Sequence, residues 1–347
     1  MPEGSGPWNE VILHTFAGGT DGAAPHGNLV FDTSGDLYGT LYGNSGAAIG
    51  GVFQLSPSPL GWVNTILYTN GFGLGEGPGR VINGTGSLYG EIGTGQDKAG
   101  AIGELSTKSG GWSYTQVYSF CSGSSCPDGD EPPTPPIWDG RGNLYGVTVE
   151  GGIDKPPCFS TTGCGVIFRM VRNSETTWTY QVLHRFTSSP SASSPPDGEW
   201  PYGGLVMDAA GNFYGSTWLG GKYNHGTVFK FQSNGSDVWK ETLIYDFPNC
   251  LQGCMVEGTL AMDKAGNLYG TAAGGTGSCG GAACGVIFEL SPQSNDQWKY
   301  TVLHYLNSSD GGVQPFYGVI LDDKGNLFGV TSGFGLAGGG TAFEITP

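Results

Sequence analysis

The stretch Gly266-Asn267-Leu268-Tyr269-Gly270 is one copy of a five-residue pattern that decides how this chain folds. The pattern occurs six times, with an aromatic residue in its fourth place at positions 38, 89, 145, 214, 269 and 328. Successive aromatic residues are 51 to 69 residues apart. A short motif that recurs at such intervals, with variable insertions between copies, is typical of a repeat architecture. The sequence therefore predicts six equivalent structural units.

The fourth unit shows how each unit is built. Its apolar and alternating segments are separated by turns rich in Gly, Asn and Asp, which predicts strands at residues 202–208, 212–217, 226–231 and 239–247. Six units of four short strands favour a six-bladed all-β propeller with four-stranded antiparallel blades over a sandwich or a barrel. We expect a single domain over residues 1–347, with residues 1–7 disordered or added in place of a signal peptide.

The two ends of the chain predict how the ring closes. Residues 8–16 have the pattern of the outermost strand of a unit, whereas the last unit ends at residues 341–345 with its third strand. An N-terminal strand at residues 11–16 would complete the last blade and remove an exposed sheet edge. We therefore predict a ring closed by the N-terminal strand, as the outermost strand of the blade built from residues 317–346.

Composition limits the partners and the compartment. The net charge of −16 disfavours nucleic acid and anionic membrane surfaces, and the absence of any apolar run of 18 residues argues against membrane insertion. Three to five residues separate the cysteines of each close pair, which fits local disulfides better than zinc ligands and implies an oxidising compartment. We expect a secreted or cell-surface monomer with four disulfides, namely Cys121–Cys126, Cys158–Cys164, Cys250–Cys254 and Cys279–Cys284.

The fourth unit also carries the motifs of a known repeat, namely Asp197-Gly198, Gly204-Leu205, Gly211-Asn212, Gly220-Gly221 and Gly226-Thr227-Val228-Phe229. Their order resembles the GloVer (gloeo/verruco) tandem repeat of bacterial surface and secreted proteins and, more distantly, the NHL-type propeller repeat. The resemblance covers nearly the whole chain and implies an extracellular β-propeller. It implies no single activity, because such propellers serve both as binding modules and as enzymes.

Residues that all units share are expected to be structural. An Asp three residues before the turn Gly can accept hydrogen bonds from the turn backbone, at Asp32, Asp139, Asp208, Asp263 and Asp322. One outer-strand position alternates between His and Tyr, at His14, His184 and His304, which favours packing over chemistry. An Asp-Gly step, at Asp21, Asp128, Asp197 and Asp310, is expected to form a turn, although a ring of carboxylates near the axis could hold Ca²⁺. No other metal or cofactor is expected.

Residues that interrupt the repeat are the candidates for function. Aromatic residues next to amide and imidazole groups suit a sugar, because an aromatic face covers the apolar face of a pyranose while polar groups bind its hydroxyls. The predicted binding residues are Trp200, Tyr202, Trp218, Asn224, Arg80, Lys155 and His26. Other unrepeated residues of the same loops include Asp130, Glu131, Glu257, Phe316 and Tyr317.

Two reactions on a polysaccharide are open. Hydrolysis of a glycosidic bond needs two carboxylates across a cleft, for which Glu91 and Glu150 are the candidates. Elimination on a uronic-acid chain needs a base, His225 or Tyr223, and a cation to neutralise the substrate carboxylate, Arg80 or Lys155. The chain is thus expected to be a glycoside hydrolase, a polysaccharide lyase or, without catalysis, a lectin-like or protein-interaction propeller.

Overall fold

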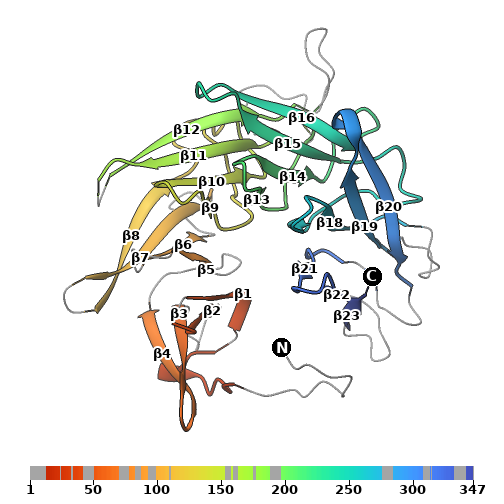
Figure 1. Cartoon of the computed structure of the whole chain (residues 1–347). Helices are drawn as coiled ribbons and strands as arrows, with labels where there is room; N and C mark the ends of the chain where they lie inside the picture. Colours follow the sequence, from red (N-terminus) through yellow and green to blue (C-terminus); the bar gives the residue numbers. More distant parts are fainter. Residues whose placement is uncertain are drawn as a thin grey trace.

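The computed structural model describes an all-β protein built from antiparallel sheets (Figure 1). The described residues are 13–23, 25–32, 34–41, 51–69, 78–82, 87–92, 99–108, 111–152, 158, 163–174, 177–187, 197–275, 284–307, 313, 315–331 and 341–346. Within these ranges the only helical segments are two 3₁₀ turns, η1 (Gly19–Asp21) and η2 (Ser294–Asp296). Neither has the length or the hydropathy to span a bilayer.

Within these ranges the strands form six sheets that follow one another along the chain. The first sheet contains β1 (Pro25–Phe31), β2 (Leu37–Leu41), β3 (Gly51–Ser58) and β4 (Gly61–Thr69). The second contains β5 (Pro78–Ile82), β6 (Ser87–Ile92), β7 (Ala101–Lys108) and β8 (Gly111–Ser119). The third contains β9 (Ile137–Trp138), β10 (Asn143–Thr148), β11 (Val166–Arg172) and β12 (Trp178–Arg185).

The remaining sheets repeat this order. The fourth contains β13 (Val206–Met207), β14 (Phe213–Thr217), β15 (Thr227–Ser233) and β16 (Trp239–Asp246). The fifth contains β17 (Ala261–Met262), β18 (Leu268–Ala272), β19 (Val286–Pro292) and β20 (Trp298–Tyr305). The sixth, in the described residues, contains β21 (Ile320–Leu321), β22 (Leu327–Thr331) and β23 (Thr341–Ile345). Figure 1 shows the sheets arranged around a common centre, with β1, β9, β13 and β21 nearest to it.

The hydrophobic core is divided into layers between consecutive sheets. In the layer between the fourth and fifth sheets, Val228 and Phe247 pack with Leu268 and Phe288, all at most 1% exposed. Equivalent layers join the second sheet to the third and the third to the fourth. A sheet that buries both faces against its neighbours explains why the strands after each turn are apolar on both sides.

Close approach at the centre requires glycine. A Cβ on Gly318 would lie 2.0 Å from the carbonyl oxygen of Thr259, and one on Gly258 would lie 2.2 Å from the backbone nitrogen of Gly318. The segments that lead into β17 and β21 therefore touch backbone to backbone. A larger residue at either position would push the two sheets apart.

The shared aspartates have the structural role that the sequence predicts. The Asp208 Oδ1 accepts hydrogen bonds from the backbone N–H groups of Ala210 and Asn212, both at 2.9 Å. The same pair of turn bonds is made at Asp32, Asp139, Asp263 and Asp322. This carboxylate holds the β-turn between the first and second strand in the first, third, fourth, fifth and sixth sheets.

The alternating His and Tyr position does more than pack. The Tyr118 hydroxyl donates a hydrogen bond to Asp128 at 2.6 Å, and the His184 Nε2 lies 2.8 Å from Asp197. His14 makes the same contact with Asp21. Imidazole and phenol can both donate to a carboxylate, which explains why the repeat accepts either residue. Asp128 and Asp197 thus bind an outer strand, and Asp21 binds the N-terminal segment.

Three predicted disulfides are present, Cys121–Cys126, Cys158–Cys164 and Cys250–Cys254. Cys284 is also disulfide-bonded, while Cys279 lies outside the described residues. Three disulfides are consistent with an extracellular protein. The zinc alternative is wrong for these pairs because their sulfur atoms are joined to each other.

Two predictions about strands need correction. The first strand of the fourth sheet is only Val206–Met207, because residues 200–204 turn instead of extending the strand. The described part of the predicted N-terminal strand, Leu13–Phe16, has no strand assignment, and Phe16 packs edge-on against Phe53 of the first sheet at 4.9 Å. Val11 and Ile12 lie outside the described residues.

Candidate functional site

The site candidate is a cavity of about 970 Å³ near the centre of the sheet arrangement. Its walls come from the segments that precede the first strands of the third to sixth sheets, together with Glu91 at the end of β6. The chemically distinctive lining residues are Glu91, Glu131, Tyr202, Glu257, Phe316 and Tyr317. A concave site that combines apolar walls with a few convergent polar groups is typical of ligand binding.

An unusual backbone conformation positions this wall in three sheets. Glu131, Trp200 and Met255 have φ angles of 54°, 58° and 57°, in the left-handed region that non-glycine residues rarely adopt. The N–H of each residue donates to a loop carbonyl of the preceding sheet, at Ala99, Cys164 and His225. The carbonyl oxygens of the same three residues accept hydrogen bonds from N–H groups of their own sheet, those of Val149, Trp218 and Ala273. We call this pair of backbone hydrogen bonds the clamp. In each sheet the residue two positions after the clamped residue lines the cavity, namely Pro133, Tyr202 and Glu257.

Two of the three lining carboxylates are perturbed by their surroundings. Burial raises the pKa of Glu257 to about 7, against the opposing effect of the Trp218 side chain. Burial and the negative charge of Glu150 raise the pKa of Glu131. The third, Glu91, is 8% exposed. Carboxyl groups that remain partly protonated near neutral pH can donate a proton in catalysis.

Further carboxylates lie directly behind Glu131. Asp130 and Glu150 form an isolated β-bridge with reciprocal backbone hydrogen bonds of 2.8 and 3.0 Å, which keeps the two residues side by side. Burial, followed by the charges of Glu131 and Glu150, raises the pKa of Asp130 to about 6. Of this group of acids in the third sheet, Glu131 lines the cavity.

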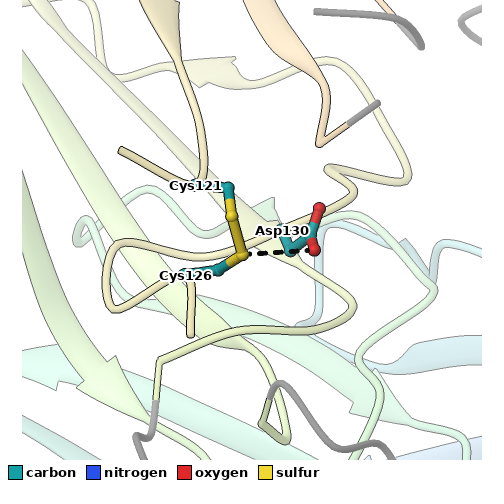
Figure 2. Close-up of side chains that lie close together, drawn as sticks. All are labelled: Cys121, Cys126 and Asp130. Carbon is teal, nitrogen blue, oxygen red and sulfur yellow. Dashed lines mark hydrogen bonds between the residues drawn. A yellow bond between two sulfur atoms is a disulfide. The ribbon is translucent and has the colours of Figure 1, made fainter. Parts of the chain in front are cut away.

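Asp130 also lies beside a disulfide. Figure 2 shows its carboxylate next to the Cys121–Cys126 bond, 3.5 Å from the Cys126 sulfur. The two sulfur atoms and the Asp130 carboxylate lie within 4.8 Å of one another. Metal binding by cysteine uses the thiolate, which a disulfide does not provide. This grouping is therefore no metal site while the disulfide is intact.

In the fourth sheet, Tyr202 lines the cavity and packs against two indole rings. Trp200 and Trp218 stack with centroids 5.4 Å apart and planes 18° from parallel. Tyr202 stands edge-on to both, at 6.2 Å from each, and is 37% exposed. Burial and the charges of Glu131, Glu257 and Glu150 raise the pKa of the Tyr202 hydroxyl. The ring of Tyr202 thus stands between the acids of the third and fifth sheets.

The structure brings some of the predicted site residues together and places others elsewhere. Glu91 and Tyr202 line the cavity, and the two indoles support Tyr202 from behind. Glu150 pairs with Asp130 behind the lining. Arg80 and His26 lie in β5 and β1, but their side chains are outside the described part of the structure, as is all of Lys155.

Three predicted residues of the fourth sheet are absent from the cavity lining. The Asn224 side chain accepts the Gly220 N–H at 3.1 Å and so closes its own loop. The Tyr223 ring is 43% exposed beneath the Lys222 ammonium, 4.9 Å from its centroid. The His225 Nδ1 lies 3.8 Å from the Cys250 sulfur. The base predicted for elimination is therefore not at the cavity.

Two lining acids were not chosen as site residues from the sequence, although a signal for them exists. Glu131 lies eight residues before Asp139, as Trp200 lies eight before Asp208. Glu257 lies six residues before Asp263, as Tyr202 lies six before Asp208. Counting back from the shared Asp would have placed both acids at the positions of the fourth sheet's aromatic residues.

Consecutive antiparallel sheets of three or four strands in the described residues, each carrying one copy of the motif, define an all-β repeat protein. The family model of the Gloeobacter/Verrucomicrobia repeat matches residues 86–284 and 132–347. The chain belongs to this repeat family, as its motifs indicate. No curated protein matches it.

Similar solved structures share the fold at low sequence identity. A candidate 6-phosphogluconolactonase from Bacteroides uniformis is 12% identical, with a TM-score of 0.50 over 92% of this chain and 84% of that one. The extracellular domain of a candidate one-component system from B. thetaiotaomicron is also 12% identical, with a TM-score of 0.51 over 96% of this chain and 34% of that one. An α-L-arabinanase from Penicillium chrysogenum is 14% identical, with a TM-score of 0.47 over 95% of this chain and 96% of that one. This likeness is too low to carry an argument about function.

Proposed function

We propose that this protein is a secreted or cell-surface six-bladed β-propeller that binds a carbohydrate polymer at the central cavity and hydrolyses a glycosidic bond there. The observation that carries the proposal is the meeting of Glu91, Glu131 and Glu257 with Tyr202 at one cavity. A rigid aromatic ring costs little ordering entropy on binding, and carboxylates bind sugar hydroxyls.

The packing of Phe16, the last residue of the predicted N-terminal strand, supports ring closure by that strand. Phe16 packs onto Phe53 of the first sheet, as Phe186 packs onto Phe229 and Phe247 onto Phe288 of the sheets that follow them. By the register of β19 with β20, Val11 should pair with Glu344. A Val11→Cys/Glu344→Cys variant should then form a disulfide in a monomer, whereas Val11→Cys/Asp296→Cys should not.

Hydrolysis needs one carboxyl group as proton donor and another as nucleophile or base. Glu257 fits the donor, because burial keeps part of it protonated near pH 7. Glu131, from the other side of Tyr202, or Glu91 would act as the second carboxylate, where the sequence had nominated Glu150 with Glu91. This chemistry requires no metal or cofactor.

Elimination on a uronic-acid chain is less well supported. It requires a cation to neutralise the substrate carboxylate. The lining residues of the described cavity include three glutamates and neither Lys nor Arg. A negative cavity repels a uronic acid at close range. Hydrolysis of a polymer without carboxylates is therefore the reaction that the lining favours.

A non-catalytic lectin is the second candidate, because the same cavity could hold a sugar without cleaving it. A panel of polysaccharides, assayed for retention and for new reducing ends, separates the two. We expect Tyr202→Ala to lose retention and Glu257→Gln to keep it while losing new reducing ends. Tyr223→Ala, which removes an exposed aromatic ring outside the cavity lining, is the matched control. Retention by Tyr202→Ala equal to the wild type would refute this site.

A further inference from the structure

We infer that the saccharide bound in the cavity carries a protonated amino group, held at the Glu131 side and facing Tyr202. This inference rests on the proposed function and names the substrate class of the same site. The observations that carry it are the distribution of charge around the cavity and the position of one aromatic ring between acids from two sheets.

Carboxylates from three sheets line the cavity, and two more acids lie next to Glu131 in the third sheet. Asp130, Glu131 and Glu150 come from two adjacent segments of the third sheet, joined by the backbone bonds of Asp130 with Glu150. The charges that act on Asp130 are those of Glu131, Glu150 and Asp128, and all of them disfavour its ionised form. Like charges held this close cost electrostatic free energy, which a bound cation would relieve.

Tyr202 is close enough to acids of the third and fifth sheets for their negative charges to act on its hydroxyl. The Tyr202 hydroxyl is influenced by Glu131 and Glu150 from the third sheet and by Glu257 from the fifth. The negative face of an aromatic ring attracts a cation, and carboxylates beside the ring add to the attraction. An ammonium group that contacts Glu131 and the Tyr202 ring would therefore be stabilised from two directions. The Trp200 and Trp218 stack holds that ring in place.

The cavity dimensions favour a saccharide over a small amine. A volume of about 970 Å³ is far larger than an ammonium group requires. The remaining walls include Phe316 and Tyr317, which offer apolar surface to a sugar ring. A chain of amino sugars supplies both the cation and the flat apolar faces. Glucosamine oligomers are the simplest ligands of this kind.

The test compares three tetrasaccharides of equal length at pH 6 by calorimetry: glucosamine, N-acetylglucosamine and galacturonate. The glucosamine tetramer should bind at least about tenfold more tightly than the N-acetylated one, because acetylation removes the charge. Its affinity should fall with added salt, as expected for a charge interaction. Glu131→Gln should abolish most of this preference. Asp296→Asn removes one exposed charge far along the chain in η2 and should leave the preference unchanged.

The other outcomes separate this inference from the proposed function. Equal affinity for the glucosamine and N-acetylglucosamine tetramers overturns the inference and leaves carbohydrate binding intact. An unchanged preference for glucosamine in Glu131→Gln does the same. Tightest binding of galacturonate overturns the inference too. Displacement of the sugar by spermidine at equal affinity shows a cation site without saccharide selectivity and also overturns it. Failure of every saccharide, including a neutral hexose panel, overturns the proposed function itself. Circular dichroism of each variant checks that it is folded.

Discussion

The indole rings of Trp200 and Trp218 stack 5.4 Å apart, and the backbone N–H of Trp218 donates to the Trp200 carbonyl at 2.9 Å. Trp200 pays for this position with a left-handed backbone, φ 58°. The clamp places Tyr202 at the cavity and Trp218 close to Glu257 of the next sheet. The two stacked tryptophans thus connect the left-handed backbone of Trp200 in the fourth sheet with Glu257 in the fifth.

The first prediction concerns the protonation of Glu257. The polar side chain of Trp218 favours the ionised form of the Glu257 carboxylate, while burial favours the protonated form. If Glu257 is the proton donor, activity falls as the pH rises through its pKa of about 7. Trp218→Phe keeps a ring and removes the N–H, so the alkaline limb of the kcat/KM profile should move to higher pH. A limb that stays in place, or moves down, contradicts the role of Trp218.

The second prediction concerns a buried ion pair between sheets. Arg172 of the third sheet donates to Glu104 of the second at 3.2 Å, and the Glu104 side chain is 4% exposed. Arg172→Leu leaves the buried Glu104 carboxylate without this cation, next to the hydroxyl donors of Ser87 and Tyr89. We expect a loss of about 2–4 kcal/mol in the free energy of unfolding.

Chemical denaturation measures this loss, and Arg141→Leu is its control. Arg141 is an exposed turn residue, so its replacement should change the free energy of unfolding by less than about 0.5 kcal/mol. Similar losses in the two variants would show that the buried pair does not hold the second and third sheets together.

The third prediction concerns a repeat position on the outer strands. Tyr180 and Tyr300 occupy it in the third and fifth sheets, and each hydroxyl donates to a loop carbonyl, of Asp128 and Gln252. The fourth sheet has Glu241 there, and its Oε1 is buried with no hydrogen-bond partner in the described chain. A carboxyl group can do the work of the tyrosine hydroxyl only when it is protonated.

Glu241 is held in the protonated form. Burial, with the charge of Asp197, raises its pKa to about 8 despite the opposing charge of Lys240. Since the folded pKa exceeds the unfolded value of 4.5, the folded state binds the extra proton. The stability contributed by this proton is fully present below pH 4.5 and is lost as the pH rises through 8, with a slope of at most about 1.4 kcal/mol per pH unit.

Glu241→Gln tests this assignment, because glutamine stays neutral and keeps a donor. The difference in unfolding free energy between variant and wild type should shift in favour of the variant between pH 5 and pH 8. Asp130 and Glu257 also titrate in this window, but they are present in both proteins and cancel in the difference. A difference that is constant with pH would show that Glu241 ionises as an ordinary surface acid.

The fourth prediction concerns the disulfides. Each closes a loop of four to six residues, for which the chain-entropy model gives about 2 kcal/mol. Replacing both cysteines of any one pair by serine should lower the free energy of unfolding by about this amount. Thiol titration of the unfolded, unreduced protein should find no free thiol, including at Cys279 and Cys284. Two thiols per chain would contradict the fourth pair.

The repeat allowed much of the fold to be predicted. The pattern around Tyr214 and the turn chemistry of Asp208 are local, so the strands, the turns and the sheets follow from residues close in sequence. The cavity wall depends on contacts between sheets. Trp200 has a left-handed backbone, its N–H bonds to Cys164 of the preceding sheet, and the first strand of the fourth sheet therefore starts later than expected. No local propensity of Trp indicates such a turn.

The site was predicted in part for the same reason. Glu91 stood out because it breaks a pattern within one strand, and it lines the cavity. Glu257 and Glu131 also depart from the repeat, but their place at the cavity depends on the backbone hydrogen bonds that connect their segments to neighbouring loops. His225 and Asn224 attracted attention by residue type, yet they serve their own loop or lie beside a disulfide. Choosing His225 and Asn224 by residue type alone was therefore misleading, because neither residue lines the cavity.

The central claim is that the cavity with Glu257 and Tyr202 cleaves a carbohydrate polymer. The most direct measurement is the rate of appearance of new reducing ends from the best polymer of the panel, in wild type, Glu257→Gln and Asp296→Asn. The account predicts that Glu257→Gln lowers the rate at least about 100-fold while binding is retained, and that Asp296→Asn matches the wild type. Undiminished cleavage by Glu257→Gln would contradict it.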